Sequence, residues 1–172
     1  QDTPISIAFG ESGYRSLDIE TAVAFTDENR DYQLRVGFSE FLADDFEFSF
    51  GLSGWYHEQD IEDQGSASFD FMFRYHAFGE DTERGVSPAR TLYAEAGIGM
   101  LFSTGDVPDF GSEVNFIPRA GGGVTWKPFD DSAMRVNLGL RWHHISNASI
   151  FGSDENPDRD ALMIFAGVRF PL

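Results

Sequence analysis

Close to the C-terminus, a histidine and a serine stand two residues apart in the run His144-Ile145-Ser146. If this stretch is a β-strand, residues i and i+2 point to the same side, so the imidazole and the hydroxyl are neighbours. A hydroxyl within reach of an imidazole is the nucleophile and base pair of a serine hydrolase. An acidic segment follows within a few residues. The spacing therefore indicates hydrolytic chemistry at one end of a strand.

Other chemistries have little support in the composition. The chain has no cysteine, so disulfides, thiolate catalysis and cysteine-ligated metals are excluded. Its four histidines show no recognisable metal-ligand spacing, so we expect neither a metal nor a cofactor. An acidic loop could hold Ca²⁺ or Mg²⁺ loosely, but a solvated loop is the favoured interpretation; its carboxylates are Asp154, Glu155, Asp158 and Asp160. The net charge of -17 argues against nucleic acid as a partner.

The elements that must position these residues are strands. At 172 residues the chain has the length of one domain, and we expect residues 1–172 to form it. Alternation of apolar and polar residues predicts eight strands separated by turn-rich stretches, at 18–26, 32–41, 45–57, 66–77, 90–103, 113–127, 133–146 and 160–172. A further run, Ile5 to Phe9, also alternates. The fold class predicted is all-β, an eight-stranded antiparallel barrel.

The two rows of each predicted strand favour a transmembrane barrel over a soluble sandwich. The apolar rows carry essentially no charge, apart from Glu40 at a strand end, which suits a surface facing lipid. The polar rows mix small residues with nearly balanced charges, which suits a lumen filled by side chains. The charges predicted to lie in the lumen are Arg35, Arg74, Arg119, Arg135, Arg141 and Arg169 with Glu20, Glu47, Asp70, Glu95 and Glu113. Most of the net charge then belongs to loops.

Strand ends and turn lengths predict the orientation. Aromatic residues near strand ends fit interfacial girdles, namely Tyr32, Tyr56, Tyr75, Tyr93, Trp126 and Trp142. The short connections at 43–45 and 128–132 are expected on the periplasmic side, with the longer ones at 59–65, 103–112 and 147–159 outside. An even strand count places both termini in the periplasm, although the stretch 79–89 is long for that side.

Parity places the candidate site on the outer wall. His144 and Ser146 continue the row of Leu138, Leu140 and Trp142, which we assign to lipid. His143 has the opposite parity and is expected in the lumen. A histidine and a serine facing outward at the membrane boundary have no lumenal network to join, so a functional role is favoured over a girdle position.

The stretch Arg141-Trp142-His143-His144-Ile145-Ser146-Asn147-Ala148, followed by Asn156-Pro157 and a closing strand, resembles the lipid A 3-O-deacylase (PagL) family. The motif match is specific and covers roughly residues 141–172; elsewhere the likeness lies in barrel length and pattern. The resemblance implies an eight-stranded barrel of the bacterial outer membrane. It also implies a His–Ser–acid triad on the outer wall, and removal of the ester-linked 3-O acyl chain from lipid A without a cofactor.

Carried over by position, the resemblance makes His144 the base and Ser146 the nucleophile. It places the acid at Asp160, where the family has Glu, with Glu155 and Asp158 as alternatives. Oxyanion or substrate contacts fall to Asn147, to the backbone N–H of Ser149 and to the side chain of Asn156. Ser149 stands where the family commonly has Gly. The implied partners are lipopolysaccharide and the outer membrane; whether the chain is a monomer or a homodimer stays open.

Two other functions remain as alternatives. The first is a non-enzymatic structural or adhesive barrel whose acidic loops bind cations, in which Ser146 and His144 are chemically silent. The second is a soluble lipid-carrier barrel with its apolar rows inward. This last reading ranks lowest, because arginine and glutamate would then form the entire exterior.

Overall fold

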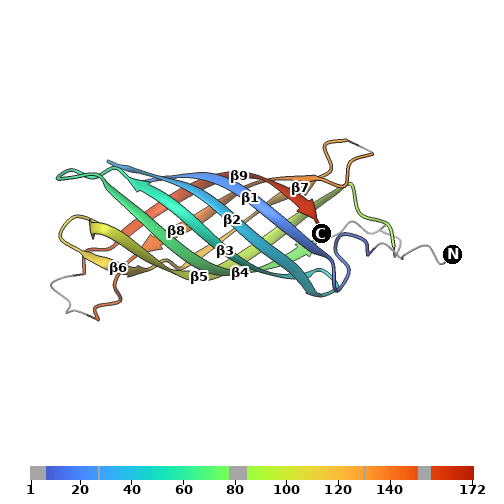
Figure 1. Cartoon of the computed structure of the whole chain (residues 1–172), viewed down its shortest axis with the longest axis horizontal. Helices are drawn as coiled ribbons and strands as arrows, with labels where there is room; N and C mark the ends of the chain where they lie inside the picture. Colours follow the sequence, from blue (N-terminus) through green and yellow to red (C-terminus); the bar gives the residue numbers. More distant parts are fainter. Residues whose placement is uncertain (1–6, 27, 78–84, 130, 151–155) are drawn as a thin grey trace.

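The computed structural model describes residues 7–26, 28–77, 85–129, 131–150 and 156–172. Its strands form one antiparallel sheet that closes on itself as a barrel (Figure 1). The strands are β1 Arg15–Phe25, β2 Arg30–Ala43, β3 Phe46–His57, β4 Gln64–Ala77, β5 Arg90–Val107, β6 Ser112–Phe116, β7 Arg119–Trp126, β8 Arg135–Ile145 and β9 Arg159–Pro171. No helix among the described residues is long and apolar enough to cross a membrane.

The nine labelled strands make eight barrel staves, because β6 and β7 lie in line along the same neighbour, β5. They are separated at Ile117-Pro118, and proline has no N–H to give to a sheet ladder. Pairing of β4 with β5 and of β1 with β9 completes the ring. The eight-stranded prediction is therefore confirmed, and each predicted span overlaps its stave. β1 begins and β9 ends at the same end of the barrel (Figure 1).

Two sequence expectations fall partly outside the described residues. Of the alternating run Ile5 to Phe9, the structure describes residues 7–9, which are not strand. Phe9 instead packs edge-on against Tyr14 and Phe41 at the end where β1 begins. Of the long connection at 79–89, residues 78–84 lie outside the described part of the chain.

The lumen is filled by ion pairs, as the polar rows predict. Six arginines are each at most 2% exposed: Arg35, Arg74, Arg119, Arg135, Arg141 and Arg169. Arg169 is held between Asp18, at 2.9 Å, and Glu47, at 2.7 Å, and Arg141 bonds both Glu20 and Glu95. A buried charge is costly unless it is paired and hydrogen-bonded, and these ion pairs lower that cost. Arg135 instead donates to Thr125 and lies over the ring of Phe9.

The structure corrects one of the lumen assignments and one of the girdle assignments. Glu113 is exposed instead of lumenal, and it lies where the register of β6 on β5 is irregular, between Ser112 and Val114. Tyr93 is 6% exposed and faces inward with Thr91 and Glu95, so it is no girdle residue. Three further charged residues belong to the interior: Asp18, Asp31 and Arg159.

The outer wall is apolar along the full height of the staves. Its exposed side chains include Leu34, Leu52, Tyr75, Leu92, Leu140 and Leu162, each more than half exposed. Contiguous apolar surface on this scale marks a surface that meets lipid or another apolar partner. The girdle predictions for Tyr32 and Tyr56 are consistent with this wall, since both are exposed and their ring centroids lie 6.2 Å apart.

Candidate active site

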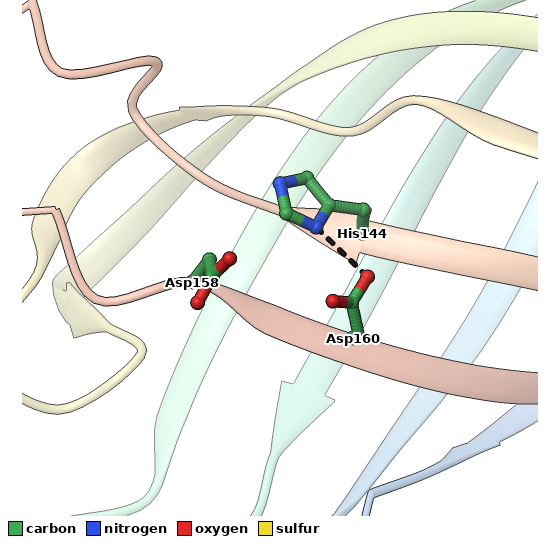
Figure 2. Close-up of side chains that lie close together, drawn as sticks. All are labelled: His144, Asp158 and Asp160. Atoms are coloured by element: carbon green, nitrogen blue, oxygen red, sulfur yellow. Dashed lines mark hydrogen bonds and ion pairs between the residues drawn. The ribbon is translucent and has the colours of Figure 1, made fainter.

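The site lies where β8 ends and β9 begins. In the register of these two strands His144 stands opposite Asp160. The Nδ1 atom of His144 lies 2.9 Å from Oδ1 of Asp160, a hydrogen-bond distance (Figure 2). The pairing follows from the sheet itself, because directly opposed residues on one face have neighbouring side chains. Of the two acid candidates that the structure describes, Asp158 and Asp160, Asp160 is therefore the one bonded to the imidazole, and Glu155 lies outside the described residues.

The carboxylate sets the state of the imidazole. An ionised carboxylate only accepts hydrogen bonds, so His144 must donate through Nδ1. In the neutral ring the lone pair is then on Nε2, which is the state that a general base requires. The same Oδ1 of Asp160 accepts a hydrogen bond of 2.8 Å from Nε1 of Trp142. Two donors on one carboxylate favour its ionised form.

Trp142 is a site residue that the sequence assigned only to a girdle. Besides bonding Asp160, its ring stacks on the imidazole of His144, with centroids 5.5 Å apart and planes inclined by 25°. Trp142 and His144 are at i and i+2 on β8, so the parity that joins His144 to Ser146 also brings this ring beside it. The i and i+2 spacing of Trp142 and His144 is visible in the sequence, but an aromatic ring at a strand end is ordinarily explained as a girdle residue.

Ser146 lies one residue beyond the end of β8 and is still tied to the barrel wall. Its backbone exchanges two hydrogen bonds with Phe116 of β6, of 2.8 and 3.2 Å. Its side-chain Oγ accepts the N–H of Ala148 at 3.3 Å, and the residue is 9% exposed. Within the described residues no hydrogen bond joins Ser146 to His144. The two residues are close in the sequence, but their side chains are not bonded to each other.

A strained turn follows Ser146. Ala148 and Ser149 have φ of 53° and 59°, a region that residues other than glycine and asparagine seldom adopt. The turn is held from inside by Asn147, whose Oδ1 accepts the Ser149 N–H at 2.9 Å. It is held from outside by Asn156, whose Oδ1 accepts the Asn147 N–H at 2.9 Å and whose Nδ2 donates to Ser149 Oγ at 3.3 Å.

The turn thus brings together all three residues predicted to contact an oxyanion or substrate. In this arrangement the Ser149 N–H is already donated to Asn147. One N–H of the Asn156 amide is donated to Ser149 Oγ. Residues 151–155 of the same connection, which include Asp154 and Glu155, are outside the described part of the chain.

Asp158 lies beside the pair without bonding it. One ligand atom from each of His144, Asp158 and Asp160 lies within 4.8 Å of the other two (Figure 2). Imidazole nitrogen and carboxylate oxygen are ligands that divalent metals accept. Both carboxylates are exposed to solvent, however, and one of them already orients His144.

A groove opens on the β1 side of the site. Its volume is about 780 Å³, and its lining includes Phe25, Asn29, Trp142, Asp160 and Leu162. The groove exists because β1 ends before β9 begins: Leu162 is the first residue of β9 with a partner in β1. Its lining mixes the apolar side chains of Phe25, Trp142 and Leu162 with polar and charged ones, so the groove could take a substrate that has both an apolar and a polar part.

Comparisons with known proteins concern the family and the fold. The model of the lipid A 3-O-deacylase (PagL) family matches residues 31–169. A crystal structure of the outer membrane enzyme PagL superposes with a TM-score of 0.66 at 23% identity, covering 87% of this chain and 97% of that one. The crystal structure of Neisserial surface protein A (NspA) superposes with a TM-score of 0.60 at 14% identity, covering 91% and 94%. No curated protein sequence matches the chain.

Proposed function

The chain belongs to the lipid A 3-O-deacylase (PagL) family of outer-membrane ester hydrolases, and from this we propose that it removes the 3-O-linked acyl chain of lipid A with Ser146 as nucleophile, His144 as base and Asp160 as acid. The observation that carries the proposal is the 2.9 Å bond between His144 Nδ1 and Asp160, on the outward row beside Ser146. It fixes the tautomer that leaves Nε2 as a base.

The first half of the reaction transfers the acyl group to the enzyme. Ser146 Oγ attacks the ester carbonyl carbon while His144 Nε2 takes the hydroxyl proton. The tetrahedral intermediate collapses with cleavage of the bond to the sugar 3-oxygen, which receives that proton from the imidazolium. The products are the free 3-hydroxyl on the sugar and an acyl ester on Ser146. Asp160 stabilises the imidazolium throughout, without becoming protonated.

The second half returns the enzyme to its starting state. A water molecule gives a proton to His144 Nε2 and attacks the acyl-enzyme carbonyl. Collapse of the second intermediate breaks the bond to Ser146 Oγ, which takes the proton back. The fatty acid leaves and no metal or cofactor enters the proton balance. For the attack to occur, Ser146 Oγ must exchange its contact with the Ala148 N–H for one with His144, which requires a rotation about its χ1.

The turn after Ser146 is the proposed oxyanion site. The Asn156 amide has two N–H groups, one of which is donated to Ser149 Oγ. We assign the second to the developing oxyanion, together with a backbone N–H of the 147–149 turn that is released when the serine rotates. Donors held in advance where charge develops supply a large part of a hydrolase's rate.

The position of the site suits this substrate. The ester bonds of a lipid lie at the boundary between headgroup and acyl chains, which is where the outward rows of β8 and β9 leave the apolar wall. Leu140 and Leu162 lie on these rows below Trp142 and are both about half exposed. An acyl chain lying along this wall keeps its apolar surface out of water. A triad in the lumen would have no access to such a bond.

The proposal is tested by mass spectrometry of purified lipid A after incubation with the wild-type protein and with Ser146→Ala. The wild type is expected to remove one 3-O-linked acyl chain, and the variant is expected to leave lipid A intact. Ser103→Ala, another serine at this end of the barrel, is the matched control and is expected to remain active. Deacylation by Ser146→Ala would refute the assigned nucleophile.

A further inference from the structure

Asp160 stands on a part of β9 that the sheet supports on one side only. The register between β1 and β9 ends at Phe25 and Leu162, so residues 159–161 have no partner in β1. They pair with β8 alone, through the opposed residues Ile145, His144 and His143. The groove described above occupies the missing side. The acid of the proposed triad therefore lies on a strand end that could swing away from β8.

A buried arginine spans the gap beneath the groove. Arg159 precedes Asp160 and has the opposite parity, so its side chain points into the lumen while Asp160 points out. Its Nη1 donates to Oδ1 of Asp31 in β2 at 2.7 Å. Its Nη2 donates to Oε1 of Gln59 in the β3–β4 loop at 3.0 Å. Two contacts from one planar group fix direction as well as distance.

The anchor on the far side is itself rigid. Asp31 and His57 are both 0% exposed, stand opposite each other in β2 and β3, and bond through Asp31 Oδ1 and His57 Nδ1 at 2.8 Å. Gln59 is in turn fixed by donating its Nε2 to the carbonyl of Asp106, at 2.9 Å. The start of β9 is thus tied through Arg159 to β2, to β3 and to the loop after β3.

We propose that Arg159, bound to Asp31 and Gln59, is a positioning residue that holds the open end of β9 against β8 and so keeps Asp160 on His144. Arg159 touches no reacting atom. Its effect reaches the chemistry through one peptide bond, because a strand residue cannot shift without moving its neighbour. The inference rests on the proposed function, since it assigns a role in the same triad.

A different buried pair provides the matched control. Arg35 in β2 and Asp70 in β4 form an ion pair of 2.7 Å, and both side chains are 1% exposed. This pair resembles the Arg159–Asp31 pair in chemistry and burial, but among the described residues it has no hydrogen bond or ion pair to β8 or β9. Its further ion pair joins Asp70 to Arg119 of β7, at 3.6 Å. A general loss of barrel stability should follow either substitution, whereas loss of the acid's position should follow only one.

The experiment compares Arg159→Met with Arg35→Met in refolded, detergent-solubilised protein. For Arg159→Met we expect kcat for lipid A deacylation to fall about tenfold to a hundredfold with little change in KM, the size expected when a catalytic group is misplaced by about 1 Å. For Arg35→Met we expect a lower melting temperature and an unchanged kcat. Equal losses of kcat in the two variants, or no loss in Arg159→Met, would overturn the proposal.

A second readout does not depend on activity. The His144 Nδ1 proton, bonded to Asp160, should give a downfield proton NMR resonance that His144→Gln abolishes. We expect Arg159→Met to shift or broaden this resonance and Arg35→Met to leave it unchanged; an unchanged resonance in Arg159→Met would also overturn the proposal. If Ser146→Ala were still active, the proposed function would fail while this signal still reported on Arg159.

Arg159→Lys covers the case in which Arg159→Met does not fold. Lysine keeps a cation for Asp31 but has no second donor arm for Gln59. We expect a folded protein with kcat between wild type and Arg159→Met, or reduced severalfold if the methionine variant cannot be measured. Wild-type kcat in Arg159→Lys together with a wild-type resonance would contradict the proposal that Arg159 must bind both Asp31 and Gln59.

Discussion

Two adjacent histidines on β8 lie on opposite faces of the barrel wall and have different surroundings. His143 points into the lumen, is 0% exposed, and stacks its ring on Trp55 with centroids 5.1 Å apart. His144 points outward, is partly exposed, and bonds Asp160. One residue of register moves a side chain from one face of a sheet to the other. The inner face therefore packs and neutralises the barrel, and the outer face can meet a lipid substrate.

Substitution of each histidine by alanine tests the different roles of the two faces. We expect His144→Ala to lower kcat/KM for lipid A by on the order of 10⁵-fold, because removing a base removes the unit to which the nucleophile belongs. His143→Ala should leave kcat/KM close to wild type and lower the melting temperature, since it loses the ring contact with Trp55 and leaves a cavity in the lumen. Comparable losses of activity in the two variants would contradict the assignment of the two faces.

The two carboxylates near His144 allow the next test. Asp160→Asn should lower kcat by about 10³- to 10⁴-fold, because an amide can no longer fix the imidazole tautomer. Asp158→Asn should change kcat little, since Asp158 has no hydrogen bond to His144 among the described residues. Steady-state kinetics on both variants decides the identity of the acid. A larger loss in Asp158→Asn would transfer the role to that residue.

A third prediction concerns stability and the lipid-facing row. Leu140→Arg places a charge on the outward face of β8, and should destabilise the barrel by about 2–4 kcal/mol if it lies near the bilayer midplane. Leu140→Ala, at the same position, should cost less. The measurement is the free energy of unfolding by urea in lipid vesicles. Equal costs for the two substitutions would show that this row does not face lipid.

The smallest expected effect concerns divalent cations. Because the proposed proton transfers involve only Ser146 and His144, EDTA should leave hydrolysis of a soluble short-chain ester within about twofold of its starting rate. A soluble ester is chosen so that removing cations does not alter a lipopolysaccharide aggregate. A large loss that Mg²⁺ or Ca²⁺ restores would instead favour a metal role for the His144, Asp158 and Asp160 cluster.

Most of the fold could be predicted because a lipid-facing barrel has a simple rule. One face of each strand carries apolar residues and the other carries paired charges, so an alternation of period two predicts the strands, their two faces and the lumenal position of His143. The rule was weakest where a stave was irregular. Pro118 divides β6 from β7. Glu113, in the irregularly paired part of β6, is exposed to solvent instead of lying in the lumen.

The site was predictable only in part, because it depends on contacts between strands. The pair His144 and Ser146 is local, and their common face follows from spacing. The choice of Asp160 over Asp158 depends on the register of β8 and β9, which the sequence does not display. The proposed roles of Trp142 and Arg159 depend on ring stacking and on an ion pair to Asp31, more than a hundred residues away in the chain.

Ser146 is the proposed nucleophile on the outer wall of the barrel. Labelling with a lipid-like fluorophosphonate, followed by peptide mapping in a mass spectrometer, measures whether this serine is reactive. We expect a single phosphonate adduct on Ser146 in the wild type, strongly reduced in His144→Ala and absent in Ser146→Ala. An unlabelled Ser146 in protein that deacylates lipid A, or an adduct on a different residue, would contradict it.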